Sequence, residues 1–190
     1  MLYLKEHTFF DQGLHIQKIL RHMTEYDKKT RFFVTSHYPC YTYNKILQSN
    51  YPSYIIKRGG GITFHHEEQW ICYIFSYLSS KNTITDLVHN LLDVVKNCLE
   101  SFFHETFTVK EGLWIRDKKI LSIGLAIENR VTYHGLALNL FLDPALIKTI
   151  EPCSLSPDQY ASLSDFFLFS TLEIKKLLNL ALKNSYNRFC

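Results

Sequence analysis

The sequence predicts an α+β fold, a single domain in which a mixed β-sheet is flanked by helices. Segments with helical spacing of apolar residues occur near the start, in the middle and at the end of the chain, and strand-like runs lie between them. The chain has 190 residues, 46% hydrophobic and 21% charged, which suffices for one substantial core. We therefore expect one domain over residues 1–190.

Apolar stripes and N-cap signals define four expected helices, over residues 10–23, 87–102, 156–167 and 170–181. Thr83 and Ser170 begin capping motifs, and Ser156-Pro157 is typical of an N-cap followed by the first helical position. The stripe of the first helix consists of Phe10, Leu14, Ile19, Leu20 and Met23.

Six apolar runs between these helices are expected to be strands, over residues 31–36, 54–57, 69–77, 112–115, 119–127 and 131–142. Asp117-Lys118 is the expected turn between the fourth and fifth strands. Glu128-Asn129-Arg130 is the expected turn between the fifth and sixth. Because strands group before and after the central helix, the sheet is expected to be mixed or antiparallel.

Charge and cysteine content narrow the class of protein. The formal net charge is +3, and the basic residues form no stripe, so we expect no nucleic-acid partner. The N-terminal segment lacks the apolar stretch of a signal peptide, and no run approaches a membrane span, so we expect no membrane association. Five cysteines without CxxC spacing favour free thiols in a reduced, cytoplasmic protein.

A run of three glycines, residues 59–61, is concentrated in a chain with only seven glycines. Consecutive glycines let the backbone come close to a ligand. No Gly-Lys-Ser/Thr follows, which excludes a P-loop, and the spacing does not fit the dinucleotide fingerprint. With Arg58 before the run and Thr63 and His65 after it, we interpret the segment as a ligand-binding loop and not as a simple hairpin.

Three residues are candidates for acid–base or nucleophilic chemistry. Cys153 precedes a predicted helix N-terminus, whose dipole favours a thiolate, although a free cysteine is more often a small buried hydrophobe. Lys119 opens a strand, where lysines usually face solvent; beside a thiol it would lower the thiol pKa. His134 could instead form a Cys–His pair. Position in the sequence leaves open which of them meet.

The segment His65-His66-Glu67-Glu68 contains four residues of types that bind metals. Adjacent residues of an extended chain point to opposite faces and rarely converge on one ion. We expect no metal site there.

These segments together resemble the lipoyl(octanoyl) transferase family. The resemblance rests on four motifs in series, with His37 and Pro39 in an upstream His, one residue, Pro pattern. The four motifs are Arg58-Gly59-Gly60 with Thr63-Phe64-His65 and Gln69; Lys119-Ile120 with Ser122-Ile123-Gly124; Thr132-Tyr133-His134-Gly135-Leu136-Ala137-Leu138-Asn139; and Pro152-Cys153. They run from about residue 31 to residue 153 in the family's order.

The resemblance implies the fold of biotin and lipoate ligase catalytic domains and an acyl transfer in lipoate biosynthesis. Octanoyl-acyl carrier protein would be the donor. Lipoyl domains of 2-oxoacid dehydrogenase complexes and the glycine cleavage H protein would be the acceptors. Cys153 would be the nucleophile and Lys119 its base, with no cofactor because the acyl group arrives activated. The implied substrate-binding residues are Arg58, Gly59, Gly60, Gly61, Ile62, Thr63, Phe64, His65, Ser122, Ile123, Gly124, Gly135, Leu136 and Ala137.

Two alternatives stay open. An ATP-dependent lipoate–protein ligase shares the glycine-rich loop and a lysine but needs no cysteine at position 153. A catalytically silent lipoyl-domain-binding relative is favoured by a departure from the family: His66-Glu67-Glu68 replaces Gly-Pro-Gly, and Ser154 replaces the glycine after Cys153. We expect Glu67 and Glu68 to point outward, since a carboxylate facing an apolar site is costly.

Overall fold

The computed structural model describes residues 1–43, 51–59, 61–80, 83–143 and 156–189. Its larger sheet has seven strands in the order β1-β2-β6-β10-β9-β8-β7. Only β1 and β2 pair in parallel, so the sheet is mixed, as predicted. The bounds are β1 (Leu2–Leu4), β2 (Arg31–Thr35), β6 (Gln69–Phe75), β7 (Thr108–Val109), β8 (Gly112–Ile115), β9 (Lys118–Glu128) and β10 (Val131–Asn139).

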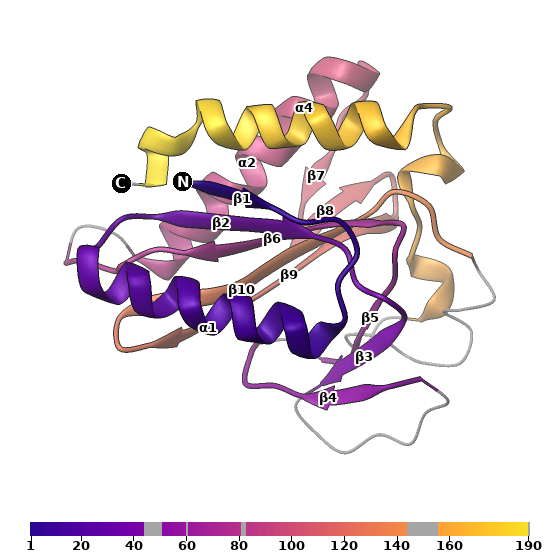
Figure 1. The fold of residues 1–190 in the computed structure, drawn as a ribbon. Helices are drawn as coiled ribbons and strands as arrows, with labels where there is room; N and C mark the ends of the chain where they lie inside the picture. The colour runs from indigo at the N-terminus through magenta and orange to yellow at the C-terminus, as the bar shows by residue number, and fades with distance from the viewer. Residues whose placement is uncertain (44–50, 60, 81–82, 144–155, 190) are drawn as a thin grey trace.

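A smaller sheet has the order β4-β3-β5, with β3 (Cys40–Tyr43), β4 (Ser53–Ile55) and β5 (Thr63–His65). It lies on the same side of the large sheet as helix α1 (Phe10–Asp27) (Figure 1). Phe10 at the start of α1 packs with Cys40 and Ile56 of this region. The glycine-rich segment 59–61 leads directly into β5.

Helices cover both faces of the large sheet (Figure 1). Helix α1 packs on one face, while α2 (Ile84–Phe103) and α4 (Thr171–Asn184) pack on the other. Successive side chains of the central strands point to opposite faces of the sheet, because side-chain direction in a strand repeats every two residues. Thus Phe32, Cys72 and Leu136 face α2 and α4, whereas Phe33 and Tyr73 face α1.

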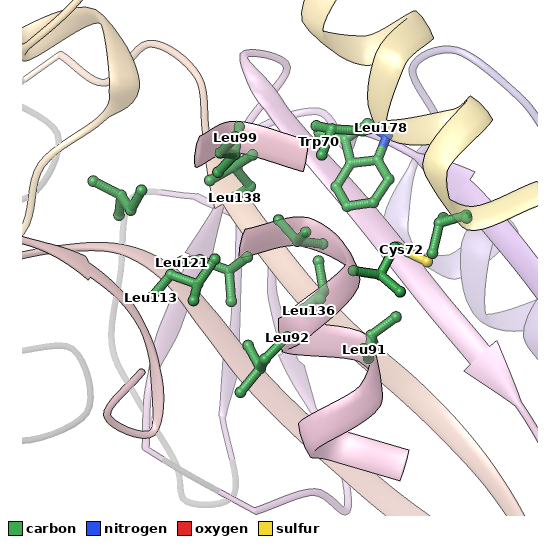
Figure 2. Packing of buried hydrophobic residues seen from close by; sticks show 14 of the residues in the cluster. Trp70, Cys72, Leu91, Leu92, Leu99, Leu113, Leu121, Leu136, Leu138 and Leu178 are labelled. Carbon is green, nitrogen blue, oxygen red and sulfur yellow. The ribbon is translucent and has the colours of Figure 1, made fainter. Parts of the chain in front are cut away.

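The main core lies between the sheet and helices α2 and α4. Figure 2 shows Trp70 and Cys72 of β6 beside Leu178 of α4, with Leu91 and Leu92 of α2 nearby. The helix N-terminus predicted at Thr83 is confirmed: Thr83 and Asp86 exchange hydrogen bonds in a capping box.

Two predictions about helices were wrong. Residues 156–167 do not form one helix but two short 3-10 turns, Pro157–Gln159 and Leu163–Asp165, because Tyr160 and Ala161 between them pair with Lys119 of β9. In α1, Ile19 and Met23 of the predicted stripe are exposed. The buried face of α1 is more polar than the stripe and consists of Phe10, Gly13, Gln17, Leu20, Arg21 and Thr24.

The predicted strands are present with shifted ends, and the structure adds β1, β3, β5 and β7. The turn between β9 and β10 is confirmed: Asn129 and Arg130 both have positive φ, 50° and 64°, as a two-residue hairpin of type I′ requires. The turn between β8 and β9 lies one residue earlier than predicted, at Arg116 and Asp117.

Candidate active site

The predicted glycine-rich loop lies against strand β9. Arg58 donates hydrogen bonds from Nη2 to the Thr42 Oγ1 (3.0 Å) and the Thr63 Oγ1 (2.7 Å), and from Nη1 to the Gly59 carbonyl oxygen (3.0 Å). A Cβ added to Gly124 of β9 would lie 2.9 Å from the Gly59 carbonyl oxygen. Only a glycine at 124 permits this close approach of loop and strand.

The second and third predicted segments are paired directly. Gly124 of β9 faces Gly135 of β10, and Ser122 faces Ala137. A Cβ at Gly135 would lie 1.9 Å from the Cys72 carbonyl oxygen, so β10 approaches β6 closely as well. The described parts of the three segments predicted to bind substrate therefore meet where β9 and β10 pass the glycine-rich loop.

Individual side chains in these segments point in different directions. Leu136 is part of the core beneath α2 and α4, and Ile123 packs against that core. Ala137 belongs to the cluster beneath α1. Phe64 is buried against Tyr41 in the small sheet, with Ile62 packed beside them. Gly61 is half-buried, and Gly60 lies outside the described residues.

His65 is buried with both ring nitrogens bonded. Its Nε2 lies 3.3 Å from the Thr42 hydroxyl, and its Nδ1 lies 3.2 Å from the Gln69 side-chain oxygen. Burial lowers its pKa well below the usual range, and the nearby charges of His37 and Arg58 act in the same direction. His65 therefore stays neutral and is held in place at neutral pH.

Two further histidines lie near this group. Burial lowers the pKa of His37 to about 4, and its Nε2 lies 2.6 Å from the Tyr73 hydroxyl. Burial, assisted by the charge of Arg58, lowers the pKa of His134 to about 4. His134 also has a φ of 63° within β10, and its backbone N–H donates to Gln17 of α1. Such a φ is unusual for a residue other than glycine and is characteristic of functional sites.

Lys119 is buried, at 5% exposure, in contrast to the usual solvent-facing lysine at a strand end. Its Nζ lies 5.9 Å from the centre of the Trp114 ring. Its carbonyl oxygen accepts a hydrogen bond from the Ala161 N–H (3.0 Å), beside the bridge between Lys119 and Tyr160. The chain that follows the predicted nucleophile therefore runs along Lys119.

Cys153 itself lies outside the described residues, which resume at Ser156. Tyr160, which pairs with Lys119, follows Cys153 by seven positions in the sequence. Seven residues span at most about 25 Å even when fully extended. At the end of β10, the Leu140 and Phe141 N–H groups donate to the carbonyl oxygen of Glu68, the last residue of the His66-Glu67-Glu68 substitution.

The outward orientation expected of the two glutamates is confirmed for Glu68, which is exposed. Glu67 is only partly exposed, and its charge contributes to the raised pKa of the Cys40 thiol. Within the described ranges, no three side chains of the metal-binding types lie close enough to hold an ion. None of the helices described is both long and apolar enough to cross a bilayer.

Several residues of the site had no assigned role in the sequence analysis. The sequence indicated Gln69 and Asn139 only as members of family motifs. It gave no indication that Thr42, Tyr73 and Gln17 belong to the site. Amides in a buried strand are a usable signal, because buried polar groups need hydrogen-bond partners. Thr42 is not an amide and Gln17 lies on a helix, so neither of them carries this signal.

The sequence matches a known protein family and several named relatives. Residues 16–183 match the lipoyl protein ligase A/B catalytic domain. The chain belongs to this family. An octanoyltransferase of Persephonella marina is 28% identical over 170 residues, which cover 84% of both chains. An octanoyltransferase of Buchnera aphidicola subsp. Acyrthosiphon pisum is 32% identical over 158 residues, which cover 78% of this chain and 74% of the relative.

The fold also matches solved structures of the family. A crystal structure of lipoate-protein ligase A bound with ATP superposes with a TM-score of 0.82, at 15% identity, over 98% of this chain and 85% of the ligase. This likeness confirms the predicted single-domain α+β fold of the lipoate ligase type.

Proposed function

We propose that the protein transfers an octanoyl group from octanoyl-acyl carrier protein to a lysine of lipoyl domains. Family membership supports a role in protein lipoylation, and the octanoyltransferase relatives favour octanoyl transfer over the ligase alternative. The acceptors would be the lipoyl domains of 2-oxoacid dehydrogenase complexes and the glycine cleavage H protein. The reaction passes through a thioester on Cys153.

The observation that carries the proposal is the buried position of Lys119 beside Tyr160 and Ala161. Tyr160 and Ala161 follow Cys153 by seven and eight positions, and both contact Lys119. A buried lysine beside this segment is suited to stabilise the Cys153 thiolate. An ammonium group close to a thiol stabilises the thiolate. Lowering the thiol pKa by two units needs about 2.7 kcal/mol of differential interaction, which one close charge can supply.

The other described thiols are unsuited to the role. Burial raises the pKa of Cys40 to about 12, with Glu67 contributing, and burial also raises the pKa values of Cys72 and Cys98. A thiol with a raised pKa is a poor nucleophile at neutral pH because little thiolate is present. Cys153 follows the family's Pro-Cys motif and is the nucleophile in our proposal.

The chemistry divides into two balanced steps. The Cys153 thiolate attacks the octanoyl carbonyl carbon, and the pantetheine thiolate leaves and takes a proton from the Lys119 ammonium group. The acceptor lysine amine then attacks the enzyme thioester and gives a proton to the neutral Lys119 amine. The Cys153 thiolate is expelled, so the enzyme regains its starting state.

The glycine-containing segments would hold the acyl chain and the pantetheine arm. Gly59 offers backbone without a side chain, and Gly124 keeps β9 free of a side chain beside it. Arg58 braces the loop through the Thr42 and Thr63 hydroxyls.

The test supplies purified protein with a lipoyl domain and either octanoyl-acyl carrier protein alone or octanoate with ATP and Mg²⁺. We expect modification of the acceptor lysine with the first donor and none with the second. Modification that requires ATP would instead assign a ligase, and no modification with either donor would favour a silent lipoyl-domain-binding protein.

A further inference from the structure

Two buried amides, Gln69 and Asn139, join the glycine-rich loop to the strand of Lys119. Their hydrogen bonds run from Thr42 through His65, Gln69 and Asn139 to the Ala161 carbonyl oxygen. We propose that Asn139 is a positioning residue that holds the segment after Cys153 against Lys119. This inference rests on the proposed function and deepens it.

Two backbone carbonyls fix the direction of every bond in this network. The Gln69 amide nitrogen donates to the Phe64 carbonyl oxygen (3.2 Å) and to the Asn139 side-chain oxygen (2.9 Å). A carbonyl oxygen can only accept, so the nitrogen of Gln69 must lie on this side. The Gln69 oxygen then faces His65 Nδ1, which must carry the proton.

The rest of the orientation follows. With Nδ1 protonated, neutral His65 accepts at Nε2, so the Thr42 hydroxyl donates to it and accepts from Arg58 Nη2. At the other end, the Asn139 amide nitrogen donates to the Ala161 carbonyl oxygen (3.0 Å). Each group between Arg58 and Ala161 therefore has a donor on one side and an acceptor on the other.

Ala161 connects the network to Lys119. Its carbonyl oxygen accepts from Asn139, and its N–H donates to the Lys119 carbonyl oxygen. The backbone of Ala161 is thus held between β10 and β9, eight positions after Cys153 in the sequence. Loss of the Asn139 bond would free one side of this segment and loosen its placement against Lys119.

Burial makes the arrangement hard to replace with water. Exposure is 0% for Thr42, 7% for His65, 4% for Gln69 and 9% for Asn139. A buried carbonyl left without a donor is destabilising. The hydrogen bond from Asn139 therefore favours this position of Ala161 over one in which its carbonyl has no donor.

The test compares Asn139→Asp with Asn179→Asp. The first change keeps the acceptor for Gln69 but removes the donor to Ala161. Asn179 is a matched control because, within the described ranges, its side chain bonds through its oxygen, as acceptor for the Trp70 indole N–H. An aspartate keeps that role.

For Asn139→Asp we expect kcat to fall by roughly 10- to 100-fold, as misplacement of about 1 Å can cause. The KM for octanoyl-acyl carrier protein should change less than about twofold, since binding contacts are retained. The pH profile of Cys153 alkylation should move to higher pH. Unchanged kcat and an unchanged alkylation profile, even with a lower melting temperature, would overturn the proposal.

A second measurement uses the wild-type chain and holds even where Asn139→Asp does not fold. Nitrogen-15 NMR of histidine-labelled protein, assigned with His65→Gln, should show His65 protonated at Nδ1. Protonation at Nε2 would overturn the oriented network. This outcome is independent of turnover, whereas failure of the wild-type chain to transfer octanoyl would contradict only the proposed function.

Discussion

Lys119 and Lys118 are adjacent on β9 but differ in environment. Lys119 is buried beside Trp114, whereas Lys118 is partly exposed and bonds the Asp158 carbonyl oxygen from its Nζ. Successive side chains of a strand point to opposite faces, so the two lysines are separated by the pleat. They provide a matched pair for testing the role of the buried charge.

Lys119→Met should raise the pKa of the Cys153 thiol by removing the charge that favours the thiolate. Alkylation by iodoacetamide at pH 7 should slow by about tenfold, with the fold intact. Lys118→Met should slow alkylation much less, since it loses the hydrogen bond to the Asp158 carbonyl oxygen but not the buried charge. An identical pH profile in the Lys119 variant would remove this residue from the mechanism and make His134 the partner of Cys153.

The buried histidines predict a loss of stability in mild acid. The folded-state pKa values of His37, His66 and His134 are lowered by burial to about 4. The unfolded chain therefore binds more protons than the folded chain between about pH 6.5 and pH 4, and stability falls as pH falls through this window. At pH 5 each histidine should cost on the order of 2 kcal/mol.

Melting temperatures between pH 7.5 and pH 5 check this prediction. His66 is the best probe, because its Nε2 is buried and has no hydrogen-bond partner among the residues that the structure describes. His66→Leu should flatten the decline, whereas His15→Leu, at an exposed position of α1, should not. Equal slopes for both variants would contradict the assignment of the acid sensitivity to buried imidazoles.

The residues of the site were predicted unevenly, for physical reasons. Arg58 and Gly124 could be proposed from the sequence, because an arginine carries charge and a glycine permits close approach of the backbone. Asn139 and Gln69 act through partners up to 70 positions away, and their roles depend on which strands are neighbours. That information is absent from local sequence.

At the scale of elements, β10 is held close to β6 by Gly135. Gly135→Ala should destabilise the protein by about 1–3 kcal/mol or more, because its Cβ would meet the Cys72 backbone and not a flexible side chain. Gly59→Ala is the control, since no atom lies within 4 Å of a Cβ there. Urea unfolding that ranks the two variants equally would refute the close packing of β6 and β10.

The turn between β5 and β6 carries Glu67 and Glu68 in place of small residues. The exposed Glu68 and the partly exposed Glu67 should repel an acidic carrier protein, and salt should screen the effect. Glu67→Gln/Glu68→Gln should lower the apparent KM for octanoyl-acyl carrier protein by about two- to fivefold at low salt. Glu173→Gln on α4 should not. The same KM at every ionic strength would exclude this electrostatic account.

Elements with strong local signals were predicted well. The Thr83 capping box and the Asn129-Arg130 turn fix their own geometry. The helix expected over residues 156–167 failed because hydrogen bonds to Lys119 and Leu140 hold this segment against the sheet. Short strands such as β3 and β5 were missed because pairing with distant partners defines them, and not their own pattern.

The whole molecule brings distant segments together through its three layers. The two termini lie near each other (Figure 1), and the Thr30 hydroxyl donates to the Phe189 carbonyl oxygen. The glycine-rich loop and the segment at Ala161 come from separate parts of the chain and both contact the paired strands β9 and β10. The fold class was predictable from the pattern of helices and strands, but this convergence depends on topology.

Intact-mass spectrometry after incubation with octanoyl-acyl carrier protein, without acceptor, tests the central claim most directly. The account predicts one octanoyl adduct on the wild-type chain, mapped to Cys153, and no adduct on Cys153→Ser. Replacement of Cys98 by alanine should leave the adduct in place. An adduct that persists on Cys153→Ser, or one that maps to Cys72 or Cys98, would contradict the account.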